Sequence, residues 1–489
     1  MNAIRSHSIS SRGLGLLMAG VLSCVPLFAQ EGEARLYGQF TSGEFRTPSE
    51  ASQLWTAGAE AGATVDKNGL EFNGHFGFEF NYGNNMMGSM FTSPGYYPID
   101  ILEFTPGPKT KQTYAIDGGV AWHNRSRWTP SVQVAFKGVN YAKRKDLRYT
   151  TYRQEANVEP AIRYDGDLFH FGLGYLFEKT SEFVQAEQIG SATADSYYAF
   201  LDKGMRFGTM QVWNGSGTHL AESGVDRLPV QEISHGANLM LGLGPVEAQG
   251  TYRYYNGIVG EKGYTWFRFP SHKIEVSLQW THNTGAGEHI VRAEYSWKDR
   301  KTFETVLDRE TYGGVTVPVI YGSNIIYGSR EMAAGPSWEF TSEKGWSMEA
   351  RLTVDHSATR ITLMYPYLYY EESTHMKLEA SSSVPLGRFI LSARLGASDL
   401  LGDRSHSVEK DETNLGITSV PTHLKDWWDM ESEITDAPQI WWRLGLRYTF
   451  AGKLPFFLEA SFKGTKAFKV EHLPGSFRQT SQLSFGYSF

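Results

Sequence analysis

Hydrophobic and polar residues alternate with a period of two over long stretches of the chain. In residues 69–83, Phe72, Phe76, Phe78, Phe80 and Tyr82 fall on one parity, and polar residues occupy most of the other. The same alternation recurs in residues 346–354, 440–450 and 479–489. Successive side chains of a strand point to opposite faces, so the pattern predicts strands with one apolar face. At about 11 to 14 residues, such strands are long enough to cross a bilayer at a tilt.

The connections between these segments alternate between short and long. Short turns are predicted near Asp66, Asn124, Tyr164, Gly242, Asn283, Ser342, Val384 and Ala451, and the long connections include residues 83–111, 299–324 and 399–436. This alternation is typical of an all-β, closed antiparallel transmembrane β-barrel with short periplasmic turns and long extracellular loops. The pattern predicts about 18 strands, with about 16 as the alternative. The count of 18 requires residues 196–213 to belong to one external loop, and an even count places both termini in the periplasm.

The N-terminal region has the form of a secretory signal peptide. Arg5 and Arg12 precede an apolar stretch from Gly13 to Phe28, and a cleavage site is predicted beside Ala29 or Gln30. Residues 1–30 are therefore assigned to the signal and residues 31–489 to a single outer-membrane barrel domain. The alternative is a lipoprotein signal, because "VLSC" resembles a lipobox with Cys24 as the acylated residue. Cys24 is the only cysteine, so a chain cleaved after it carries no disulfide.

The last strand carries an apolar stripe that runs to the terminal carboxylate. Leu483, Phe485, Tyr487 and Phe489 alternate with small or polar residues. This stripe resembles the C-terminal signal by which outer-membrane barrels are recognised by the barrel-assembly machinery. The resemblance implies that this machinery is a partner and that the last strand closes the barrel against the first.

A second resemblance rests on residues 90–114, "MFTSPGYYPIDILEFTPGPKTKQTY". This segment is similar to one in an outer-membrane barrel family of Bacteroidota that has no assigned function. The resemblance implies an integral outer-membrane location, nutrient or metal acquisition, and a partner among TonB-dependent receptors. It supplies no catalytic residues.

Composition and motifs argue against several other classes of protein. The net charge of −7 argues against a nucleic-acid partner, and the sequence contains no phosphate-binding loop, HExxH motif or nucleophile elbow. His75 shares a strand face with Glu71 and Glu79, but each lies about 13 Å away along the strand, which is too far for a catalytic pair. The sequence therefore predicts no enzyme, no catalytic or metal site and no cofactor.

Several charged residues are predicted to face the lumen, and their mixed signs argue against strong ion selectivity. The candidates are Glu71, His75, Glu79, Lys273, Glu275, Arg292, Glu294, Arg443 and Arg447. A turn centred on Asn283 and Thr284 would place Lys273 opposite Glu294, and Glu275 opposite Arg292.

Two external loops have unusual compositions. The connection 83–111 is apolar and rich in proline, which predicts that it folds into the barrel mouth, with Tyr96, Tyr97, Asp100 and Phe104 as candidate constriction residues. The acidic connection 399–436 contains Trp427 and Trp428. It is interpreted either as a docking surface for a cationic or sugar ligand or as an acidic loop bound to lipopolysaccharide through divalent ions. Together these features predict a porin-like or substrate-specific channel, with a closed barrel that serves an uptake or export complex as the alternative.

Overall fold

The computed structural model describes residues 31–123, 126–145, 147–188, 198–204, 208–212, 228–261, 264–362, 368–408, 423–452 and 455–489. The predicted signal peptide, residues 1–30, lies outside them. None of the described helices is long and apolar enough to cross a bilayer. The described elements are β1 (Glu31–Gly43), β2 (Gln53–Lys67), β3 (Leu70–Ser89), β4 (Asp100–Trp122), β5 (Trp128–Lys143), β6 (Leu147–Asp165), β7 (Phe169–Gln188), β8 (Tyr198–Asp202), β9 (Gly208–Val212), β10 (Leu228–Leu243), β11 (Val246–Glu261), β12 (Tyr264–Thr284), β13 (Gly287–Tyr312), β14 (Val315–Ser342), β15 (Ser347–Thr362), β16 (Leu368–Leu386), β17 (Phe389–Leu400), β18 (Ser405–Val408), α3 (His423–Asp436), β19 (Gln439–Thr449), β20 (Phe456–Ala467) and β21 (Phe477–Ser488).

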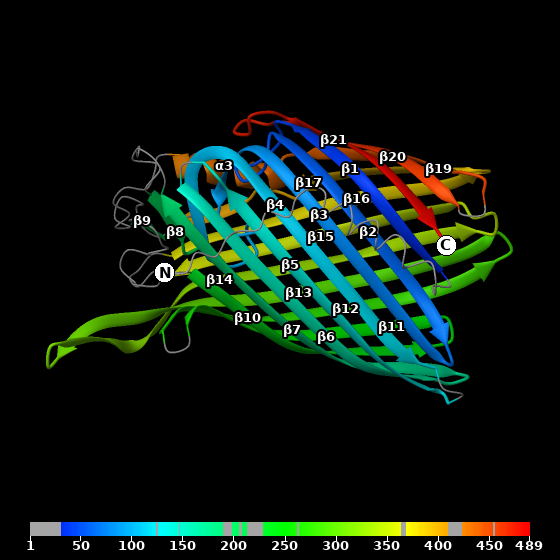
Figure 1. Cartoon of the computed structure of the whole chain (residues 1–489), viewed down its shortest axis with the longest axis horizontal. Coiled ribbons are helices and arrows are strands. Elements are labelled where there is room, and N and C mark those ends of the chain that lie inside the picture. The colour runs from blue at the N-terminus through cyan, green and yellow to red at the C-terminus, as the bar shows by residue number, and fades with distance from the viewer. Residues whose placement is uncertain are drawn as a thin grey trace, which may run out of the picture.

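The strands form one closed antiparallel barrel (Figure 1). The hairpin β8–β9 and the short β18 lie outside the closed circuit, which leaves 18 strands within it, as predicted. The circuit closes where β21 pairs with β1, from Gly43 opposite Arg478 to Glu33 opposite Ser488. At its end, the backbones of Gly32 and Phe489 exchange two hydrogen bonds of 2.7 and 2.9 Å. The terminal residue is thus part of the ladder that seals the barrel.

Large apolar side chains cover the outer surface. Ile116 on β4, Leu278 on β12, Leu395 on β17 and Leu444 on β19 are each at least half exposed. Exposure on this scale around a complete barrel is what a lipid-facing surface requires. Aromatic side chains cluster near the short turns, where Trp128 packs edge-on against Phe171 with ring centroids 5.5 Å apart. The molecule is therefore a transmembrane β-barrel.

The eight predicted short turns each fall between consecutive barrel strands at one end, on the right in Figure 1, although Asn124 itself lies outside the described residues. The turn between β2 and β3 contains Asn68 and Gly69, both with positive φ (56° and 77°), as a tight hairpin of primed type requires. The described start of β1 and the end of β21 lie at this same end (Figure 1).

The structure corrects the prediction for residues 299–324. They are not a loop, because β13 and β14 continue their pairing to a turn at Gly313 and Gly314. The resulting hairpin projects well beyond the barrel rim, at the lower left of Figure 1. Residues 83–111 are likewise mostly strand, since β3 continues to Ser89 and β4 starts at Asp100.

The predicted turn between β12 and β13 is two residues too early, so the predicted partner of each residue is wrong by four positions. The turn lies at Gly285 and Ala286, so Thr284 pairs with Gly287. Lys273 therefore lies opposite Lys298, not Glu294, and Arg292 lies opposite Gln279, not Glu275. Exposed ion pairs contribute little free energy, so the geometry of the turn outweighs the charge pairing in setting the register.

Candidate functional site

The segment from Met90 to Ile99, here called the inner loop, folds into the barrel. Met90 and Phe91 are at most 1% exposed, and Tyr97 is 5% exposed. They belong to one buried cluster with side chains from the walls of β5, β6, β7, β10, β11, β12 and β14: Tyr141, Tyr149, Val184, Ala186, Val230, Val259, Phe267, Phe269 and Ile326. An apolar segment that would otherwise lie in water is stabilised by burying this surface.

Buried polar groups of the wall hold the inner loop in place. The backbone amide of Thr92 donates to Glu182 on β7 over 2.7 Å, and the phenol of Tyr96 donates to Glu232 on β10 over 2.8 Å. Arg300 on β13 donates to the carbonyl of Tyr96 over 2.8 Å. Burial, followed by the negative charge of Glu232, raises the pKa of Tyr96 well above its ordinary value of 10. The phenol thus stays protonated as a donor.

Arg153 on β6 completes this anchor. Its guanidinium carbon lies 4.1 Å from the ring centroid of Tyr96, and Nη1 lies 3.7 Å from Glu182. Arg153 and Glu182 are 4% and 1% exposed, so both charges are withdrawn from water. Arg153 also pairs with Glu155, so removing Arg153 leaves the buried carboxylate of Glu182 without its cation, whereas removing Glu182 leaves Arg153 with one remaining partner.

The four predicted constriction residues lie in two places. Tyr96 and Tyr97 are in the inner loop, with ring centroids 4.8 Å apart. Asp100 and Phe104 belong to β4: the hydroxyl of Ser89 donates to Asp100 over 2.8 Å, and the ring of Phe104 lies 5.4 Å from that of Trp427. Glu103, beside Phe104 on β4, pairs with Lys109 of the same strand at 3.0 Å and with Lys143 at the end of β5 at 2.5 Å.

Helix α3 packs across the same end of the barrel. Leu424 and Trp427 pack against Leu102, Phe104 and Phe200, while Met430 and Ile434 pack in the cluster of Phe45, Ala437, Ala467 and Leu473. The remaining face, with Trp428, Glu431, Ser432 and Thr435, lines a cavity. Part of the connection 399–436 is therefore a helix, which a prediction based on alternation misses. The 3–4 residue spacing of Leu424, Trp427, Met430 and Ile434 is the signal that indicates it.

The end of α3 is latched to the barrel wall. Asp436 accepts a hydrogen bond of 2.8 Å from His375 on β16 and lies 2.5 Å from the guanidinium of Arg404, which also pairs with Glu371. Burial opposes ionisation of Asp436, but the hydrogen bonds from His375 and Arg404 outweigh it and lower its pKa from 3.8 to about 2.

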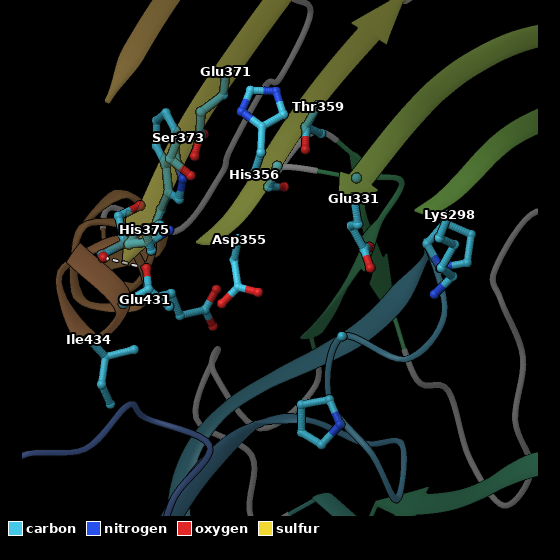
Figure 2. Close-up of a pocket in the computed structure, with 18 of the residues that line it drawn as sticks. Lys298, Glu331, Asp355, His356, Thr359, Glu371, Ser373, His375, Glu431 and Ile434 are labelled. Atoms are coloured by element: carbon cyan, nitrogen blue, oxygen red, sulfur yellow. Dashed lines mark hydrogen bonds between the residues drawn. The ribbon is translucent and has the colours of Figure 1, made fainter. Parts of the chain in front are cut away.

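The inner loop, α3 and strands β12–β17 enclose a polar cavity of about 1040 Å³, here called the mouth cavity (Figure 2). In Figure 2, Lys298 and Glu331 enter from one side, Asp355 lies in the middle, and Glu431 and His375 lie on the other side. Asp355 is paired with Lys377 at 2.6 Å. Within the described part of the chain, neither Lys298 nor Glu331 has an ion-pair partner within 4.0 Å.

A second cavity of about 450 Å³ lies deeper in the lumen, against β11–β15. Its lining includes Glu275, Glu294 and Arg351. Ser296 and Ala333 line both this cavity and the mouth cavity. The two spaces therefore adjoin along one wall, whereas the inner loop fills the opposite side of the mouth.

The predicted lumen residues lie on the strand face opposite the lipid-facing side chains, spread around the barrel. Their partners are His123 for Glu71 (3.1 Å), Asp117 for His75 (3.2 Å), Tyr37 for Glu79 (2.9 Å), Glu275 for Lys273 (2.7 Å), Glu339 for Arg292 (2.9 Å), Arg351 for Glu294 (3.7 Å), Ser461 for Arg443 (3.5 Å) and Glu33 for Arg447 (2.9 Å). Only Lys273, Glu275 and Glu294 line the two cavities. Among the described residues, no group of three or more His, Cys, Asp or Glu could hold a metal ion.

Sequence reasoning missed Arg153, Glu182, Glu232 and Lys298. Each is a charged residue at one of the alternate strand positions that face the lumen, and that alternation was the only available signal. Their roles depend on where a distant loop inserts.

This fold and its interior define a transmembrane β-barrel with a partly filled lumen. The chain belongs to a family of unknown function (DUF6850), whose model matches residues 28–489. No curated protein matches the sequence.

Among solved structures, the chain is similar to outer-membrane receptors. The ferripyoverdine receptor of Pseudomonas aeruginosa is 8% identical, with 94% of this chain and 72% of the receptor covered and a TM-score of 0.42. The ferric preacinetobactin receptor BauA of Acinetobacter baumannii is 8% identical (94% and 80% covered, TM-score 0.41), and the alcaligin receptor FauA of Bordetella pertussis is 10% identical (94% and 76% covered, TM-score 0.42). Similarity at this level carries no argument about function.

Proposed function

We propose that this protein is an outer-membrane channel for small polar solutes, with its short turns in the periplasm. The observation that carries the proposal is the adjoining pair of cavities along β12–β15, which share Ser296 and Ala333. The inner loop and α3 narrow the mouth, so the remaining space is polar and small compared with an open pore of this strand number. Charges of both signs line it, which favours solute passage over selection for ions of one sign.

The test is single-channel conductance of the purified protein in planar bilayers. Replacing Ala333 by Trp fills the junction between the two cavities and is expected to lower conductance at least several-fold. Ser461→Trp is the matched control, because Ser461 is at a lumen-facing position of β20 but lines neither cavity. It lies opposite Gly445 and Gln482. Equal effects of the two substitutions, or no conductance in the unmodified protein, would contradict the proposal.

A closed barrel that serves an acquisition complex is the second candidate. The projecting hairpin of β13 and β14 favours it, because Tyr312 and Ile320 are 60% and 57% exposed. Beyond Glu304, β13 no longer pairs with β12, and β14 pairs with β15 only from Tyr327 onward. A two-stranded ribbon is marginally stable by itself, so a partner such as a TonB-dependent receptor would stabilise it. Loss of a co-purifying protein on removal of the hairpin, without a change in conductance, would support this role.

A further inference from the structure

The wall of the mouth cavity contains an ordered row of polar side chains. Lys273 lies opposite Lys298, Lys298 opposite Glu331, Glu331 opposite Ser357, and Ser357 opposite Ser373. All five residues line the cavity. One transverse row across β12–β16 thus presents two ammonium groups, then a carboxylate, then two hydroxyls.

The middle of this row is not neutralised internally. Directly opposite residues have Cβ atoms about 5 Å apart, so Lys298 and Glu331 are close enough to pair. Within the part of the chain that the structure describes, however, no ion pair within 4.0 Å joins them to each other or to a third residue. Lys273 lies 2.7 Å from Glu275, which offsets part of its charge, and it places a second ammonium group beside Lys298.

We propose that this row binds small zwitterions of the amino-acid class as they enter the channel. The carboxylate of the solute lies between Lys273 and Lys298, where it relieves the repulsion between two ammonium groups. The ammonium of the solute lies at Glu331 and the hydroxyl of Ser357. An amino acid has its carboxylate and its ammonium group attached to one carbon. This short separation matches that of Lys298 and Glu331, which carry opposite charges on neighbouring strands.

The remaining volume accommodates a side chain. The cavity of about 1040 Å³ lies at the upper end of the range for small-molecule sites and exceeds what an amino acid fills. Trp428 and Tyr327 also line it and offer apolar surface beyond the charged row. The row therefore recognises the common zwitterionic part of the solute while tolerating different side chains.

This inference specifies the solute class of the proposed channel, and its test uses three matched probes. L-Alanine carries both charges, propionate only the carboxylate, and ethylamine only the ammonium. The readout is the block of single-channel current by each probe. We expect alanine to block at a concentration at least tenfold lower than either singly charged probe, because two charge-assisted contacts form together.

The variants assign each charge. Lys298→Gln is expected to weaken the block by alanine and propionate about tenfold and to leave the block by ethylamine unchanged. Glu331→Gln is expected to weaken the block by ethylamine about tenfold and to leave the block by propionate unchanged. The double variant Lys298→Glu with Glu331→Lys keeps both charges in exchanged positions and should recover alanine block. Lys463→Gln, at a lumen-facing position of β20, is the control and should leave the block by all three probes unchanged.

The outcomes separate this inference from the proposed channel. Conductance with equal block by alanine and propionate, or no recovery in the exchanged variant, would overturn the zwitterion site and leave the channel intact. No conductance would contradict the channel. Titration calorimetry of alanine into the detergent-solubilised barrel would then test the binding site independently of conductance. Absence of binding would overturn it.

Discussion

The backbone amide of Thr92 donates a hydrogen bond of 2.7 Å to Glu182, a carboxylate of the barrel wall that is 1% exposed. This bond joins residues that are 90 positions apart and holds the segment that narrows the mouth. Arg153 beside Glu182 shares the same buried environment. Glu182 is thus one anchor of the inner loop, beside the contacts of Tyr96 with Glu232 and Arg300.

Replacing Glu182 by Ala should release the inner loop. It removes the acceptor of the Thr92 amide, at a cost of about 1 to 3 kcal/mol in docking free energy, whereas Arg153 keeps its ion pair with Glu155. Glu182→Gln retains an oxygen acceptor and should cost less. The measurement is conductance together with protease cleavage within residues 90–99. Glu159→Ala, on a lumen position outside the mouth cavity, is the control. A loop that stays protected in the Ala variant would show that the apolar cluster alone holds it.

Excision of the inner loop should widen the mouth. The backbone amide of Met90 donates a hydrogen bond of 2.8 Å to the carbonyl of Ile101. Replacing residues 91–100 by Asn-Gly therefore closes the hairpin with a tight turn. Conductance should rise several-fold, because the excised residues fill one side of the mouth. Replacing residues 308–319 by Asn-Gly shortens the projecting hairpin by the same means and should leave conductance unchanged. Unchanged conductance in both variants would mean that the narrowest point lies deeper in the lumen.

The barrel itself was predictable because lipid imposes a simple rule. Every crossing strand must place apolar side chains at alternate positions and must pair on both edges, so period, length and turn spacing gave the strand count. Pairs such as Lys273 and Glu294 were predicted from charge and are wrong, since lumen ion pairs in water contribute little to register.

The interior of the mouth was predictable only in part. The apolar composition of residues 90–99 indicated that the loop buries itself, but not which wall receives it. The contact of Tyr96 with Glu232 joins positions 136 residues apart, and that of Asp436 with His375 joins positions 61 apart. Such pairings depend on the curvature of the closed barrel, which a strand-by-strand pattern does not contain.

Acid should release the end of α3 only at very low pH. The folded-state pKa of Asp436 is about 2, below its ordinary value of 3.8, so its stabilisation of the latch is complete above about pH 4 and is lost as the pH falls through about 2. Pepsin, which is active throughout this range, should cleave within α3 at pH 2 but not at pH 4. Asp436→Asn lacks the charge and should be cleaved at both. Equal protection of the two proteins at pH 4 would show that the apolar contacts of Trp427 are sufficient to hold the helix.

Replacing Phe489 by Ser should impair assembly of the barrel. The ring of Phe489 lies 5.3 Å from that of Tyr487, and its backbone pairs with Gly32, so the residue ends the strand that closes the circuit. The substitution keeps the backbone bonds but removes the aromatic end of the predicted assembly signal. Less heat-modifiable protein should reach the outer membrane, and more should be degraded in the periplasm. Phe468→Ser removes an aromatic that is 45% exposed in the connection after β20 and should assemble normally. Equal outer-membrane yields for the two variants would mean that Leu483, Phe485 and Tyr487 suffice as the signal.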